Sequence, residues 1–194
     1  MLRVDHVMGL SRLYWIPRGI ATREGVYVRY RVEEMYAVLS LESHRARCVV
    51  VGENLGTVPK DVTQAMQRHK VPGMHIAQFS FAPPRRQPLG RPAASEVASL
   101  NTHDTPPFAG FLAGKDIEDF ARLGVFSPQQ AAGRRAGREQ VVGALLRAFT
   151  GRRKAHAETY QRILAARLKH LADGPAAAVI ANLEDLWGDR KSTR

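Results

Sequence analysis

Three acidic residues of this chain, Asp5, Glu53 and Asp104, each stand at the end of a short apolar run. Buried charges are costly, so an acid that directly follows a buried strand is more easily explained by a site than by packing. Carboxylates gathered in one place are also typical of catalytic sites, where neighbouring charges adjust proton affinity. The three acids therefore form a candidate active site if the fold brings them together.

Charged and polar neighbours strengthen this interpretation. Arg3 precedes Asp5 by two residues, so the alternation of a strand places both side chains on one face. His6 follows Asp5 directly, and His103 precedes Asp104. Taken singly, each acid is equally explained as a helix N-cap or a salt-bridge partner, and each histidine as a structural residue. The joint pattern favours a site.

The order of apolar runs indicates which elements position these residues. Short apolar runs alternate with helical patterns, which is typical of a parallel sheet covered on both faces by crossover helices. The predicted fold class is therefore α/β. In a barrel of parallel strands, polar residues at the carboxyl ends converge on one mouth, where we expect the three acids. The predicted strands are residues 2–7, 48–52, 74–81, 97–101 and 177–183.

Helices are expected between these strands. Good helix formers, with apolar residues at steps of three and four, mark residues 33–43, 61–69 and 160–171. Two irregular stretches are also expected because they contain proline: residues 82–92 and the residues around Ser127 and Pro128.

The strongly basic composition bears on the choice of partner. The formal net charge is +11, but the basic residues are mostly arginine and are spread evenly, whereas a phosphate-binding face is more often a local patch. We expect one denser stretch, residues 134–154, to be a solvated helix face. Because no nucleic-acid-binding motif accompanies the charge, nucleic acid is not an expected partner.

The remaining composition favours an ordinary cytoplasmic domain. No stretch approaches the roughly 18 consecutive apolar residues of a membrane helix, and the N-terminus lacks the pattern of a signal peptide, so no membrane partner is expected. The single cysteine, Cys48, cannot form an internal disulfide and is expected to be a small core residue.

Three motifs resemble those of the amylomaltases, or disproportionating enzymes, which belong to the wider α-amylase group. They are Arg-Val-Asp-His-Val-Met-Gly-Leu at 3–10, Gly-Glu-Asn-Leu-Gly-Thr-Val-Pro at 52–59 and Thr-His-Asp-Thr-Pro-Pro at 102–107. The resemblance extends to Tyr-Trp-Ile-Pro at 14–17, Gly-Val-Tyr-Val at 25–28 and Asn-Leu-Glu-Asp-Leu-Trp at 182–187. It covers essentially the whole chain in the order of the family.

The resemblance implies a role for each acid. Asp5 is the nucleophile, Glu53 is the general acid/base, and Asp104 is the third carboxylate, which holds the hydroxyls of the sugar and favours its distorted form. A retaining enzyme of this kind needs two carboxyl groups about 5 to 5.5 Å apart, one that attacks the anomeric carbon and one that protonates the leaving oxygen.

The resemblance also implies a substrate and a reaction. Arg3, His6 and His103 are substrate-binding residues. As a 4-alpha-glucanotransferase, the protein moves an α-1,4-linked glucan segment between maltooligosaccharides by double displacement, without a metal or an organic cofactor. The expected partners are maltooligosaccharides, glucans derived from starch or glycogen, and glucose as acceptor. Two alternatives stay open: an α-1,4-glucan hydrolase of the same group, or an inactive or weakly active glucan-binding fragment.

Two departures from the family pattern concern position 54 and the length of the chain. Asn54 stands where the family usually has Asp, so a negative charge beside Glu53 is missing. The first motif matches the fourth strand of the family's (β/α)8 TIM barrel, and residues 183–187 match the eighth. We therefore expect residues 1–188 to form the C-terminal part of the barrel, roughly strands four to eight with their helices. A polar tail at 189–194 follows, and strands one to three are absent.

Overall fold

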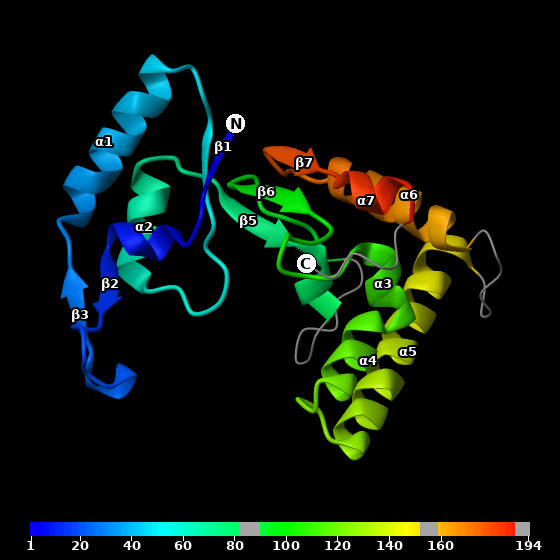
Figure 1. Ribbon diagram of the computed structural model, residues 1–194. Helices are drawn as coiled ribbons and strands as arrows, with labels where there is room; N and C mark the ends of the chain where they lie inside the picture. The colour runs from blue at the N-terminus through cyan, green and yellow to red at the C-terminus, as the bar shows by residue number, and fades with distance from the viewer. Residues whose placement is uncertain (82–89, 152–158, 189–194) are drawn as a thin grey trace. The chain divides into compact units, whose positions relative to one another are not determined.

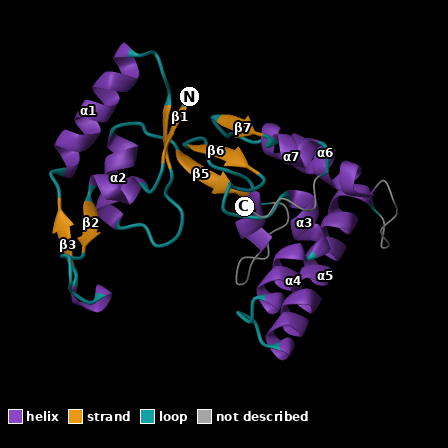
Figure 2. Cartoon of the chain, in the orientation of Figure 1, coloured by secondary structure: helices purple, strands orange, loops and turns teal. Residues whose placement is uncertain are grey.

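The structure is a computed structural model that describes residues 1–81, 90–151 and 159–188. The chain divides into two compact units, each with its own hydrophobic core. Figure 1 labels the helices and strands, and Figure 2 colours them by type. Unit 1 comprises Met1–Met74 and Ser95–Val97, and unit 2 comprises His75–Ala94 and Ala98–Arg194.

Unit 1 combines a parallel strand pair, a hairpin and two helices. Strand β1 (Leu2–Val4) pairs in parallel with β4 (Val50–Gly52). Strand β2 (Arg12–Trp15) pairs with β3 (Val26–Arg29) in an antiparallel hairpin. The remaining elements of unit 1 are α1 (Val32–Arg45), α2 (Lys60–Arg68) and the 3-10 helices η1 (Val7–Leu10) and η2 (Thr22–Glu24).

The core of unit 1 lies between its two helices and η1. Helix α2 buries Val62, Ala65 and Met66, which share one helical face because they are three or four residues apart. Tyr36 of α1 and Val7 of η1 complete this core, and both are fully buried. Val7 follows the β1 end closely, so this packing anchors the segment that carries Asp5.

Unit 2 is mainly helical. A three-stranded sheet has the order β5 (Gly73–Ile76), β6 (Glu96–Ser99) and β7 (Ala178–Ile180), and the division between the units falls within β5 and β6. In Figure 1, α4 lies alongside α5. The other elements are η3 (Ala77–Phe81), α3 (Phe108–Ala113), α4 (Lys115–Arg122), α5 (Pro128–Thr150), α6 (Thr159–Ala172) and α7 (Leu183–Leu186).

The core of unit 2 joins the sheet to its helices. Leu100, Phe108, Leu145, Ile163 and Leu171 are each no more than 1% exposed. Because they come from the end of β6 and from α3, α5 and α6, burial of this cluster holds the residues that follow β6 against the helices.

The α/β character of the chain is confirmed, and every predicted strand overlaps an observed one. All five of these observed strands are shorter than predicted. β1 ends at Val4 and β5 ends at Ile76, because the chain turns into a 3-10 helix soon after each. The interpretation of residues 183–187 as the eighth strand is wrong. Residues Leu183–Leu186 form α7, and the strand before it is Ala178–Ile180.

The predicted helices at 33–43, 61–69 and 160–171 correspond to α1, α2 and α6. The irregular stretch predicted around Pro128 is wrong, because Ser127 caps a helix there. Gln130 N donates to Ser127 Oγ at 3.2 Å, and Ser127 N donates to Gln130 Oε1 at 2.9 Å. Pro128 then occupies the first turn, where a missing N–H costs nothing. Of the irregular stretch predicted at 82–92, residues 82–89 lie outside the described residues.

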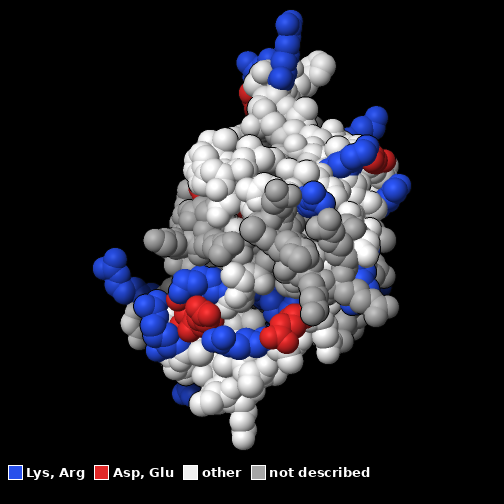
Figure 3. Space-filling model, turned by 90° about the vertical axis from the view of Figure 1, so that its right-hand side faces the viewer, with Lys and Arg blue, Asp and Glu red and all other residues white. Residues whose placement is uncertain are grey.

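The arginine-rich stretch lies on α5 as far as Gly151, and residues 152–158 fall outside the described ranges. It is not simply a solvated face: Arg138 is 14% exposed and pairs with Asp116 at 2.9 Å. Arg135 contacts Glu118 at 3.8 Å. In the lower part of Figure 3, basic and acidic side chains lie side by side rather than forming an unbroken basic surface.

Within 1–81, 90–151 and 159–188, no helix has the length and apolar character needed to cross a membrane. Over the same ranges, no group of three or more His, Cys, Asp or Glu side chains is arranged to hold a metal ion. Cys48 has a free thiol and is only partly buried, so its prediction as a core residue is wrong.

Candidate active site

Asp5 and Glu53 follow the last residues of two paired strands. In the parallel pair of β1 and β4, Val4 lies opposite Gly52. Contact continues past the strand ends, because Glu53 N donates to Val4 O at 2.9 Å and Val7 N donates to Glu53 O at 3.0 Å. Neighbouring strands lie about 4.8 Å apart. The structure thus places the backbones of the two acids side by side.

Backbone N–H groups hold the side chain of Glu53 in one orientation. Its Oε2 accepts a hydrogen bond from His6 N at 2.8 Å, and its Oε1 accepts one from Leu55 N at 3.1 Å. Each oxygen has a second acceptor position, so the two bonds fix the orientation of the carboxyl group without using all of its hydrogen-bonding capacity.

His6 has a left-handed backbone, with φ 45° and ψ 61°. A residue with a Cβ pays about 1 to 2 kcal/mol for this conformation, and such strain is concentrated at functional sites. The hydrogen bond from His6 N to Glu53 offsets part of that cost. On β4, Gly52 allows the side chain of Val7 to pack closely against the backbone. A Cβ added to Gly52 would lie 2.8 Å from Val7 Cγ2.

Arg3 of β1 and Asp5, which directly follows this strand, form an ion pair, as the alternation of side chains predicts. The Arg3 Nη2 to Asp5 Oδ1 distance is 2.6 Å. The Asp5 side chain is 70% exposed, so solvent weakens the contribution of this pair to stability. Its main effect is to orient Asp5, and the exposure leaves the carboxylate open to a ligand.

His103 and Asp104 lie in unit 2, on the segment between β6 and α3. His103 Nε2 is 3.3 Å from Asp104 Oδ2, which makes an ion pair when the imidazole is protonated. The segment is shaped by its own polar groups: Thr102 N donates to Thr105 Oγ1 at 2.9 Å, and Asp104 N donates to Thr102 Oγ1 at 3.2 Å. The Asp104 side chain is 76% exposed, so it is also open to a ligand.

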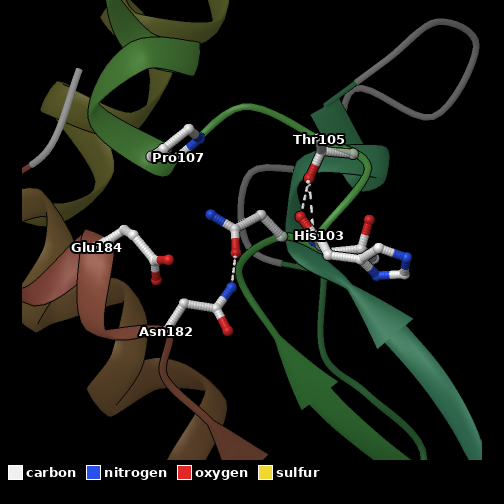
Figure 4. A pocket seen from close by; sticks show the side chains of 7 residues that line it. His103, Thr105, Pro107, Asn182 and Glu184 are labelled. Atoms are coloured by element: carbon white, nitrogen blue, oxygen red, sulfur yellow. Dashed lines mark hydrogen bonds between the residues drawn. The ribbon is translucent and has the colours of Figure 1, made fainter. Parts of the chain in front are cut away.

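This segment borders a small polar pocket of about 160 Å³ within unit 2 (Figure 4). In Figure 4, His103 and Thr105 belong to the segment, whereas Asn182 approaches from the residue before α7 and Glu184 from α7 itself. The amide, hydroxyl, imidazole and carboxylate groups on this wall suit a hydroxyl-bearing ligand. The lining residues are Asn101, Thr102, His103, Thr105, Pro107, Asn182 and Glu184.

Residues for which the sequence suggested no individual role lie behind this pocket. Asp185 is fully buried and accepts hydrogen bonds from Phe108 N at 2.7 Å and from Asn101 Nδ2, 3.0 Å from each carboxylate oxygen. Burial raises the pKa of Asp185, and the two donors oppose that rise. Asn182 Nδ2 donates to Asn101 Oδ1. In the sequence, these residues are only an acid and two asparagines beside apolar runs. That pattern does not indicate a role until their hydrogen bonds are known.

The structure therefore forms two groups from the predicted residues. Unit 1 brings Arg3 to Asp5 and His6 to Glu53, and unit 2 holds His103 beside Asp104. The sequence model of a family described as 4-alpha-glucanotransferase matches residues 1–194.

This chain belongs to the 4-alpha-glucanotransferase family.

Curated relatives in the 4-alpha-glucanotransferase family are similar in sequence to most of this chain. A 4-alpha-glucanotransferase of Mycobacterium tuberculosis is 34% identical over 98% of this chain and 27% of its own length. A 4-alpha-glucanotransferase of Haemophilus influenzae is 38% identical over 66% of this chain and 18% of its own length. The chain thus spans only about a quarter or less of these two relatives.

Solved structures of amylomaltases resemble this member of the 4-alpha-glucanotransferase family. The crystal structure of amylomaltase from Corynebacterium glutamicum matches with a TM-score of 0.76 and 29% identity, over 92% of this chain and 27% of that protein. An amylomaltase from Streptococcus agalactiae in complex with acarbose matches with a TM-score of 0.59 and 18% identity, over 95% of this chain and 32% of that protein. The second likeness concerns the fold alone.

Proposed function

We propose that this chain forms the catalytic part of a 4-alpha-glucanotransferase, which transfers α-1,4-glucan segments between maltooligosaccharides. The observation that carries the proposal is the position of Asp5 beside Glu53, at the carboxyl ends of β1 and β4. Membership of the 4-alpha-glucanotransferase family supports the choice of reaction. The chain spans only 27% of the length of its Mycobacterium tuberculosis relative, so we propose the activity for this chain and do not take it over from that relative.

The proposed reaction has two displacements at the anomeric carbon. The Asp5 carboxylate attacks this carbon, the bond to the leaving glycosidic oxygen breaks, and Glu53 transfers its proton to that oxygen. A sugar hydroxyl then attacks the same carbon, gives its proton to Glu53, and releases the Asp5 carboxylate. Arg3, 2.6 Å from Asp5, orients the carboxylate of the proposed nucleophile.

Asp104, His6 and His103 complete the proposed site. Asp104 binds sugar hydroxyls and favours the distorted ring, and the two histidines donate hydrogen bonds to sugar hydroxyls. The exposed Asp104 and the polar pocket beside it support this role.

The proposed setting is part of a (β/α)8 barrel, roughly its strands four to eight. The parallel pair β1–β4 and the likeness to an amylomaltase structure support it. Proposed donors and acceptors are maltooligosaccharides, glucans derived from starch or glycogen, and glucose. Acarbose, which the Streptococcus agalactiae amylomaltase holds, is therefore a suitable binding probe. The cytoplasm remains the predicted location.

The test is to incubate the purified chain with maltotriose and to follow glucose and longer maltooligosaccharides together. The variant Asp5→Asn removes the nucleophile with little change in size. Asp173→Asn is the matched control, because Asp173 forms an exposed pair with Lys169 and lies outside the site. We expect longer products from the parent chain and the control, and none from Asp5→Asn.

Other outcomes separate the alternatives. Glucose and maltose without longer products would indicate a hydrolase. Acarbose binding by calorimetry without any product would indicate a glucan-binding fragment. Longer products from Asp5→Asn at the parent rate would overturn the assignment of the nucleophile.

A further inference from the structure

Asp185 is a fully buried carboxylate whose partners are all in unit 2. Phe108 N donates to its Oδ1 at 2.7 Å, and Asn101 Nδ2 lies 3.0 Å from both of its oxygens. Tyr160 Oη donates to its backbone carbonyl at 2.6 Å. A buried charge is costly unless hydrogen bonds satisfy it, so this placement requires both donors to the carboxylate, the side-chain amide of Asn101 and the backbone N–H of Phe108.

The two partners of the carboxylate bracket one short segment. Asn101 immediately precedes residues 102–107, and Phe108 immediately follows them. This segment carries His103 and Asp104. A single carboxylate therefore binds the chain at both ends of the segment that presents these two side chains.

Other contacts of the segment are few or internal. Thr102 and Thr105 bond to each other within it, and Gln78 Nε2 donates to Pro106 O at 3.0 Å. Asn101 is also held from the other side, because Asn182 Nδ2 donates to Asn101 Oδ1. Asn101 and Asn182, which line the pocket, and the buried Asp185 thus form a chain of hydrogen-bonded side chains in which the carboxylate is the only charged group.

We propose that Asp185 is a positioning residue for glucan transfer: by binding Asn101 and Phe108, it sets the position of His103 and Asp104. This inference rests on the proposed function, in which these two residues hold the sugar. Asp185 does not touch the substrate, since its side chain is fully buried. Its effect passes through the backbone of residues 102–107.

An exchange of the two side chains gives a specific test. In Asp185→Asn, one carboxylate oxygen becomes an N–H donor that faces the donor amide of Asn101. In Asn101→Asp, two carboxylates face each other and Asn182 keeps its acceptor. The double variant Asn101→Asp/Asp185→Asn reverses the donor and acceptor between positions 101 and 185. The bond between these two side chains, the bond from Phe108 N and the bond from Asn182 Nδ2 are all retained, and so is the single charge.

The readouts are kcat and KM for maltotriose, with hydrogen exchange of the backbone amides of residues 102–105 and of Phe108, since residues 106 and 107 are prolines without an N–H. We expect each single variant to lower kcat by at least about tenfold (a ratio equivalent to about 1.4 kcal/mol), with a smaller change in KM, because Asp104 favours the distorted sugar. Exchange should accelerate in both single variants. The double variant should recover kcat to within about threefold and restore protection. Asp173→Asn should match the parent chain throughout.

Full activity and protection in Asp185→Asn would overturn the inference, and so would a double variant that regains protection and remains as inactive as the single variants. If the parent chain transfers no glucan, the proposed function fails instead. Hydrogen exchange then still decides whether Asp185 positions the segment. Loss of amide protection in the single variants and its recovery in the double variant support this role. Unchanged exchange in the single variants overturns it.

Discussion

Gly73 lies directly against the side-chain amide of Asn54. A Cβ added to Gly73 would be 2.5 Å from Asn54 Nδ2 and 2.8 Å from its Oδ1. The same Oδ1 accepts a hydrogen bond from Met74 N at 2.8 Å. Since Asn54 follows Glu53, this contact ties the residue beside the proposed acid/base to the start of β5. An aspartate, which the family usually has here, retains an oxygen for the Met74 bond.

Gly73→Ala should therefore destabilise the chain by about 1 to 3 kcal/mol, as overpacking does in other interiors. The added methyl group displaces the Asn54 amide and breaks its bond to Met74. Urea unfolding measures the change, and a double variant with Asn54→Ala should recover part of it. The control is Gly133→Ala on α5, which has open space around its Cα and should be neutral or stabilising. Equal stability of the parent chain and Gly73→Ala would contradict the close contact.

Tyr36→Phe should stabilise the chain by about 1 kcal/mol. Tyr36 is fully buried, and its Oη has no hydrogen-bond partner among the described residues. Leaving such a hydroxyl unpaired costs about 1 to 3 kcal/mol, and phenylalanine keeps the ring packing. Tyr27→Phe, at a residue that is 61% exposed, should change stability by less than about 0.5 kcal/mol. A loss of stability in Tyr36→Phe would show that the hydroxyl has a partner.

The same residue predicts a response to alkaline pH. Burial raises the pKa of Tyr36 to about 12 from its usual value of 10.0. The unfolded chain therefore releases this proton first, and the free energy of unfolding falls as the pH rises from 10 towards 12. Tyr36→Phe should lose this part of the pH dependence, whereas a profile parallel to that of the parent chain would refute it.

Ser11→Ala should reduce stability most clearly near neutral pH. Ser11 is 5% exposed, and its Oγ donates to Asp61 Oδ2 at 2.9 Å. This bond is the main cause that lowers the pKa of Asp61 below its usual value of 3.8. Its stabilisation is therefore present above that pH and is lost as the pH falls through the lowered pKa. We expect a cost of about 1 kcal/mol at pH 7 that shrinks below pH 4, measured by unfolding at several pH values.

A constant cost of Ser11→Ala at all pH values would instead indicate a packing effect. Ser11→Thr keeps the hydroxyl and provides the comparison, although its extra methyl group must fit a buried site. Recovery of the pH dependence in that variant, even with lower overall stability, identifies the hydrogen bond as the source.

Arg138→Lys should cost about 1.5 to 3 kcal/mol, because the lysine cannot reproduce the contacts of the guanidinium. Arg138 binds both oxygens of Asp116, at 3.0 and 2.9 Å, and its Cζ lies 3.6 Å from the centre of the Phe111 ring. The pair is largely buried, at 14% and 22% exposure, so its loss is less screened than at the surface. Arg135→Lys is the matched control on the same helix. Its pair with Glu118 is exposed and should change thermal unfolding little. Equal effects of the two substitutions would contradict this account.

Local pattern accounts for much of the fold. Alternating apolar runs predicted the strands within 2–7 and 48–52, and helical spacing predicted α1, α2 and α6, because burial of one face requires only neighbours in sequence. The Arg3–Asp5 pair was predictable for the same reason. The N-terminus of α5 is marked by an equally local pattern, the capping box of Ser127 and Gln130. The adjacent Pro128 favoured the prediction of an irregular stretch there instead of the start of a helix.

The sequence by itself determined the family, the α/β pattern and the candidate acids, because each depends on residue types at short spacing. Only the tertiary structure decided that Val4 lies opposite Gly52, so that Asp5 and Glu53 are neighbours, and that Asp185 binds Asn101 across 84 residues of chain. Strand register and buried hydrogen bonds depend on which distant groups remain to be paired once the core has closed. No local spacing contains that information.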